Sequence, residues 1–234
     1  MMLIPRVEKE NARRGVLVQG VLWSNNALYG IPIAISLYGE GNIALIALVT
    51  AVSVALFNVC SVLALERYNN KTNSDAALKW GKILRGIITN PLSISLAFGF
   101  AANLMHLQLP YFLEHTARGL ADCATPVSFI ILGASFSFAS ASHNRKTLMV
   151  VVASRLILMP LFWLALAVLL GFRDQQIAAF LLLFGPPTAV SSYPMACAMG
   201  GDERLASEII VFTSAIFIFS IFDWIFILRN LTLL

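Results

Sequence analysis

The sequence predicts an all-α, polytopic membrane helix bundle with seven transmembrane segments, two of them broken and crossing. Of the 234 residues, 59% are hydrophobic and only 12% are charged, and the mean hydropathy is +0.81. Soluble domains carry roughly a quarter charged residues, so lipid must solvate part of this surface. The net charge of +4 resides mainly in short connectors between apolar runs. Membrane orientation accounts for that pattern, and no nucleic-acid partner is expected.

Seven apolar runs define the expected segments, and each is near the ~20 residues that cross a bilayer. Because lipid offers the backbone no hydrogen bonds, each spanning run is expected to be a helix. The polar residues 1–14 are expected to be a connector before the first run. In chain order, the runs cover residues 15–37, 43–65, 87–106, 120–139, 147–170, 177–199 and 206–228.

Lysine and arginine set the expected orientation. Twelve of them lie before the first run or in the connectors after the second, fourth and sixth runs, and three lie in the other connectors and the tail. The positive-inside rule therefore places the N-terminus in the cytoplasm and the C-terminus outside, in the cell (inner) membrane. Arg155 lies inside the fifth run, near its cytoplasmic third, and is expected to reach the interface by snorkelling.

A weak internal repeat relates the first two runs to the last two. An offset of 162 residues aligns Pro32 with Pro194, Gly39 with Gly201 and Glu40 with Asp202. Inverted repeats are common in transporters, so the chain is expected to be part of a ten-helix inverted-repeat fold that lacks three helices at its start. Residues 1–65 would end the first repeat, 66–85 would be a cytoplasmic linker and 86–234 would form the complete second repeat. A complete seven-helix protein is the alternative.

Two apolar runs are interrupted near their middle by small, polar and proline residues. These are residues 24–32 (SNNALYGIP) and residues 185–194 (GPPTAVSSYP). Unpaired backbone at membrane depth is tolerated only where protein or a water-filled cavity satisfies it, and half-helix N-termini attract anions. A matched pair of broken helices therefore indicates a transport site. For the first interruption, a kinked helix whose Asn25 and Asn26 bond a neighbouring helix is an equal alternative.

Four segments resemble motifs of the auxin efflux carrier family of permeases, from about residue 13 to the C-terminus. They are SNNALYGIPI, NPLSISLAFGF, ATPVSFIILGAS and PPTAVSSYPMACAMGGDERLA. Bacterial members of that family are often described as malonate- or malate-type permeases. The resemblance implies ten helices in two inverted repeats of five. It also implies that the fourth and ninth helices, here the first and sixth runs, are broken and cross at the substrate site.

The resemblance also implies roles for individual residues. The family motif Asn–x4–Gly–x–Pro falls on Asn25, Gly30 and Pro32, and the ninth-helix proline falls on Pro187. Asn25 would face the substrate carboxylate, and Pro32 and Pro187 would shape the crossing. Thr188 and Ser191 are the nearest candidates for a second polar anchor. The expected substrate-binding set is therefore Asn25, Asn26, Gly30, Pro32, Pro187, Thr188 and Ser191.

These features predict a secondary active transporter that carries small organic anions, such as carboxylates, by alternating access. A sodium-coupled symporter of the bile-acid type and a non-transporting truncated membrane protein are the alternatives. An intramembrane enzyme is disfavoured because no metal motif, aspartate pair or serine–histidine arrangement occurs in the runs. The three cysteines have no zinc spacing, and no cofactor or metal is expected. A homodimer is compatible with this architecture.

Overall fold

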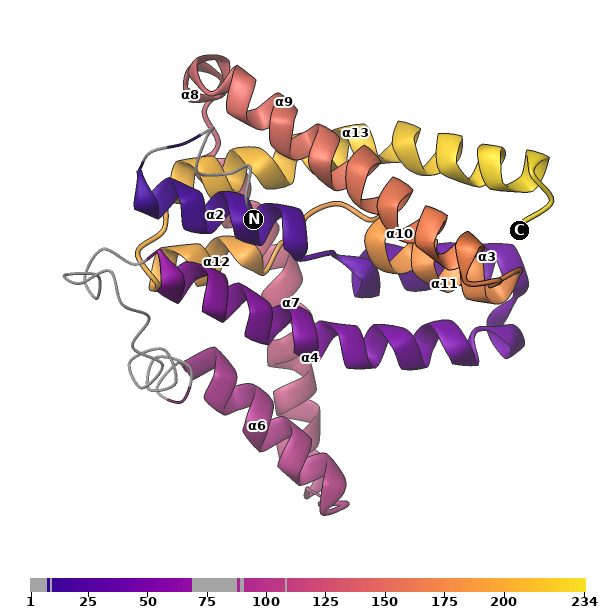
Figure 1. Cartoon of the computed structure of the whole chain (residues 1–234). Coiled ribbons are helices and arrows are strands. Elements are labelled where there is room, and N and C mark those ends of the chain that lie inside the picture. Colours follow the sequence, from indigo (N-terminus) through magenta and orange to yellow (C-terminus); the bar gives the residue numbers. More distant parts are fainter. Residues whose placement is uncertain (1–7, 9, 69–87, 89–90, 108) are drawn as a thin grey trace.

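The computed structural model describes residues 8, 10–68, 88, 91–107 and 109–234, and all regular elements among them are helical (Figure 1). The predicted all-α class is confirmed for this part of the chain. Two π-helical turns, η1 (Asn26–Gly30) and η3 (Ser154–Leu158), and a 3-10 turn, η2 (Glu40–Asn42), join longer elements. The α-helices are α2 (Asn11–Leu22), α3 (Ile31–Tyr38), α4 (Ala44–Arg67), α6 (Pro91–Leu104), α7 (Tyr111–Ser135), α8 (Phe138–His143), α9 (Arg145–Ala153), α10 (Met159–Leu169), α11 (Gln175–Phe184), α12 (Ser192–Ala198) and α13 (Glu203–Asn230).

Three described helices are long and apolar enough to cross a membrane. They are α4 with 24 residues, the continuous helix α9–η3–α10 (Arg145–Leu169) with 25 and α13 with 28. These helices match the second, fifth and seventh predicted runs. Two shorter apolar helices, Asn26–Tyr38 and Gln175–Phe184, overlap the first and sixth runs. The chain is therefore a multi-pass membrane protein.

Several predicted boundaries are wrong. The fourth run was expected at 120–139, whereas α7 begins nine residues earlier at Tyr111 and ends at Ser135, before an extended Phe136. The added turns carry an ion pair between Arg118 and Glu114, one helical turn apart at 2.8 Å, so polar residues continue the helix. Residues 11–14, expected in a connector, already belong to α2. Most of the predicted linker 66–85 lies outside the described residues.

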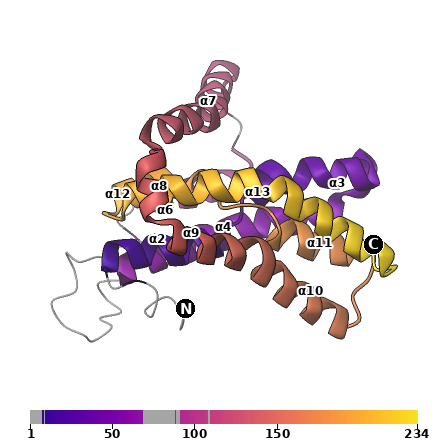
Figure 2. The same ribbon diagram turned by 90° about the horizontal axis from the view of Figure 1, so that it is seen from above.

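The helices other than α6 and α7 pack side by side into one bundle. In Figures 1 and 2, α2, α4, α9 and α13 run roughly alongside one another. Figure 1 shows α6 and α7 projecting away from them, and Figure 2 shows the same for α7. The close approach of α2 and α13 needs a small residue, since a Cβ at Gly20 would lie 3.0 Å from Ile209 Cγ2. The core between these helices includes Val16, Leu17, Val62, Leu205 and Ile209.

Candidate functional site

Two interruptions of the helical backbone meet inside the bundle. The first is the non-helical stretch 23–25 between α2 and η1, and the second is the stretch 185–191 between α11 and α12. Asn25 N donates a hydrogen bond to Pro187 O at 2.9 Å, and Ala189 N donates one to Trp23 O at 3.0 Å. These bonds form an isolated antiparallel bridge between Ser24 and Thr188. Each interruption thus satisfies backbone groups that the other leaves unpaired.

The local sequence explains where each helix stops. Pro186 and Pro187 have no backbone N–H, so they cannot continue the hydrogen-bond ladder of α11, which ends at Phe184. In the first interruption Trp23 is extended, with φ −86° and ψ 105°. Pro32 occupies one of the first two positions of α3, where proline is tolerated. The first interruption therefore lies at residues 23–25, ahead of Pro32.

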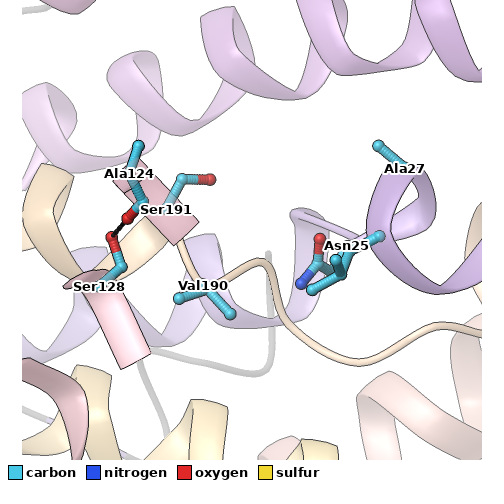
Figure 3. A pocket seen from close by; sticks show the side chains of 7 residues that line it. Asn25, Ala27, Ala124, Ser128, Val190 and Ser191 are labelled. Carbon is cyan, nitrogen blue, oxygen red and sulfur yellow. Dashed lines mark hydrogen bonds between the residues drawn. The ribbon is translucent and has the colours of Figure 1, made fainter. Parts of the chain in front are cut away.

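Two of the predicted site residues, one from each interruption, line the same cavity. Its volume is about 400 Å³, and Asn25 and Ser191 line it together with Ser128 of α7. Figure 3 shows Asn25 on one side of this cavity and Ser128 and Ser191 on the other. The Asn25 side-chain nitrogen, Nδ2, is buried and has no hydrogen-bond partner among the described residues. Its hydrogens are therefore not used by the described residues of the protein.

Two other predicted residues contact neighbouring helices instead. Asn26 is 1% exposed, and its Nδ2 donates to Ser53 Oγ of α4 at 2.6 Å. This is the interhelical bond that was the alternative for the first interruption. Gly30 packs against α11 so closely that a Cβ would lie 2.9 Å from Leu182 O. Both residues position the chain around the cavity.

Thr188 forms part of the bridge, as does the Pro187 carbonyl. The side chain of Thr188 is buried, and its hydroxyl donates a hydrogen bond to Gly20 O at 2.7 Å. The Thr188 backbone N–H donates to Thr213 Oγ1 of α13 at 3.3 Å. Its hydroxyl proton is therefore engaged within the protein. Pro32 is exposed on α3 and does not line the cavity.

Arg155 bonds both interruptions, which the sequence did not predict. It is 0% exposed, so the prediction that it snorkels to the interface is wrong. Its Nε and Nη2 donate to Pro186 O at 3.0 and 2.8 Å, and its Nη1 donates to Val21 O at 3.1 Å. These carbonyls lie at the two interruptions. They serve as hydrogen-bond acceptors for the guanidinium, which therefore does not need water as an acceptor. A charged residue inside an apolar run was the available signal, but it did not reveal the partners.

A helical membrane protein with paired backbone interruptions beside a cavity has the features of a solute carrier. The chain matches the membrane transport protein family over residues 4–225 and belongs to that family, the auxin efflux carrier family. The resemblance seen in the sequence is thereby confirmed, and the family is one of transporters rather than enzymes. The comparison with curated proteins finds no match.

Proposed function

We propose that this chain is a secondary active transporter for small organic anions such as carboxylates. The observation that carries the proposal is the cavity that Asn25 and Ser191 both line, beside the bridge that joins the two interruptions. In this proposal α2–η1–α3 and α11–α12 are two broken membrane-spanning segments that cross at the solute. The seven spans, the inverted repeat and the cytoplasmic N-terminus belong to the same proposal.

The lining of the cavity suits an anionic solute. The unpartnered Nδ2 of Asn25 offers a donor, and the hydroxyl of Ser191 can offer another. The continuous helix Asn26–Tyr38 begins at the cavity, and Ala27 and Leu28 of its first turn line it. A helix N-terminus carries partial positive charge and free N–H groups. A volume of about 400 Å³ limits the solute to a small molecule.

The arrangement of the helices supports alternating access. Ala124 and Ser128 of α7 form one wall of the cavity, whereas the opposite wall comes from the first interruption. Figure 2 shows α7 standing away from the bundle over most of its length. In the proposed cycle α6 and α7 form one unit, and the bundle that holds the crossing moves against it. The cavity would then open to each side of the membrane in turn.

Uptake of radiolabelled small carboxylates into proteoliposomes tests this function. Replacing Asn25 with alanine removes a donor to a charged group, worth about 1.5–3 kcal/mol, so uptake should fall about tenfold or more. Ser191→Ala should lower uptake less, because Ser191 is exposed and water competes for its hydroxyl. Ser36→Ala is the matched control, since Ser36 is exposed and its hydroxyl donates to Pro32 O of its own helix. Carboxylate uptake that is absent in the unmodified chain, or unchanged in Asn25→Ala, would exclude the proposed site.

A further inference from the structure

Arg155 joins the two interruptions through their helix ends. Val21 belongs to the last turn of α2, and Pro186 is the second residue after the end of α11. Both carbonyls therefore lie at the C-terminal, partially negative end of a helix dipole. The guanidinium donates from all three of its nitrogens to these two carbonyls. It is thus held in place and cannot swing towards a solute without releasing the crossing.

Among the described residues, no carboxylate forms an ion pair with Arg155. Ion pairs in the described part of the chain join Arg13 to Glu8 and Asp202, and Arg118 to Glu114. The carbonyls that bind Arg155 are neutral groups, and arginine keeps its proton in proteins. Helix dipoles offset part of a charge at most. The buried crossing therefore carries net positive charge, which is costly at membrane depth unless it has a use.

The solute cavity and Arg155 are attached to the same short stretch of backbone. Pro186, which binds Arg155, precedes Pro187, whose carbonyl accepts the bond from Asn25 N. Asn25 lines the cavity, as do Val190 and Ser191 from the other interruption. Arg155 itself does not line it, so it can act on a solute through its field rather than by contact.

We propose that Arg155 determines the charge specificity of transport: its fixed cation favours anionic solutes over uncharged ones of the same shape. This role rests on the proposed transport function, since the transported anion supplies the missing negative charge. Two unit charges ~10 Å apart at an effective dielectric constant of ~20 attract enough to change affinity roughly tenfold. A purely structural clamp would give no such preference, because neutral donors can also bond carbonyls.

The test compares small carboxylates (acetate, lactate and malonate) with their uncharged amides, using the full chain in proteoliposomes. The readout is the ratio of apparent affinities for each acid and its amide, from competition against uptake of the labelled acid. Arg155→Gln should lower this ratio roughly tenfold through weaker binding of the acid, with the amide within about twofold of the unmodified chain. Arg155→Lys keeps the charge but cannot span both carbonyls, so it should keep the ratio within about threefold while uptake falls.

The outcomes separate the two proposals. If the unmodified chain transports none of the acids, the transport function itself fails. If it transports them and Arg155→Gln keeps the ratio, only the charge-specificity role is overturned. If Arg155→Gln does not insert into membranes, Arg155→Lys provides the test. An acid-to-amide affinity ratio that falls in Arg155→Lys overturns the charge-specificity role, and a ratio that is retained supports it. Failure of both variants to insert would identify Arg155 as a structural clamp and would also overturn the role.

Discussion

Two arginines of this bundle are restrained by several hydrogen bonds each, but their acceptors differ in charge. Arg13, near the start of α2, donates to Glu8 at 2.7 Å, to Asp202 at 3.1 Å and to Asn144 at 2.8 Å. Arg155, in η3, donates only to backbone carbonyls. The side chain of Arg13 is 18% exposed, whereas Arg155 is fully buried. Water and carboxylates surround the first charge, and neither surrounds the second.

The difference shows two roles of an arginine side chain. Arg13 forms ion pairs near the surface, whereas Arg155 is buried among neutral hydrogen-bond acceptors. Burial by itself would lower the pKa of Arg13, but its bond to Glu8 and the negative charges of Glu8 and Asp202 raise that pKa overall. The protein thus compensates the charge of Arg13 with acids beside it. The charge of Arg155 is offset only in part, by the partially negative C-terminal ends of α2 and α11. We expect Arg155 to matter more for stability and to be the only one of the two that affects solute choice.

The largest effect should come from Arg155→Met, which leaves the carbonyls of Val21 and Pro186 without donors. Each unpaired buried group costs about 1–3 kcal/mol, so the free energy of unfolding should fall by about 3–5 kcal/mol. Denaturant unfolding in detergent micelles, followed by circular dichroism, measures it. Arg173→Met is the matched control, because Arg173 also donates only to carbonyls but is exposed. A loss below about 1 kcal/mol for Arg155→Met would contradict the comparison.

A smaller loss in the free energy of unfolding is expected at Asn144. This residue connects the hydrogen bonds of Arg13, here called the Arg13 network, to the buried Glu208. Asn144 accepts from Arg13, and its Nδ2 donates to Glu208 Oε2 at 2.8 Å. Glu208 is fully buried, and its other oxygen has no partner among the described residues. Asn144→Ala would leave a buried carboxylate without its donor, and should lower the free energy of unfolding by about 2 kcal/mol. The same micelle assay applies.

The control for Asn144→Ala is Asn42→Ala. Asn42 is an exposed residue that bonds Tyr38 O within its own segment, so its replacement should leave unfolding unchanged. Equal losses in the two variants would show that the bond between Asn144 and Glu208 adds nothing to stability. The Arg13 network would then be confined to the surface.

Much of the fold could be predicted because lipid imposes a simple pattern. The runs 43–65, 147–170 and 206–228 became α4, α9–η3–α10 and α13 within a few residues. Apolar length decides such helices locally. The position at which α2 ends was harder to predict. Pro32 is the residue of this run that most strongly disfavours a helix, but proline is tolerated in the first turn of α3, where Pro32 lies. The chain instead leaves the helix at residues 23–25.

The candidate site could be predicted only in part, because polar side chains choose their partners in the folded bundle. Asn25 and Asn26 are neighbours of the same type, yet Asn25 lines the cavity and Asn26 bonds Ser53. Residue type and polarity do not separate them, and only the resemblance to the family motif assigned the solute to Asn25. Arg155 is a stronger example: its partners lie 31 and 134 residues away along the chain. Those carbonyls come together only where the two interruptions meet.

The smallest expected effect is that of Arg13→Gln, and its dependence on salt distinguishes the two arginines. Partly exposed ion pairs contribute about 1 kcal/mol or less, because water and ions screen them. We expect Arg13→Gln to lower the free energy of unfolding by about that amount at low ionic strength, and by less near 1 M salt, where the Debye length falls to about 3 Å. The loss in Arg155→Met should not change with salt, since no ions reach that guanidinium. Parallel denaturation series at two salt concentrations measure both. A salt-dependent loss at Arg155 would mean that water and ions reach the crossing, and that its charge is screened like that of Arg13.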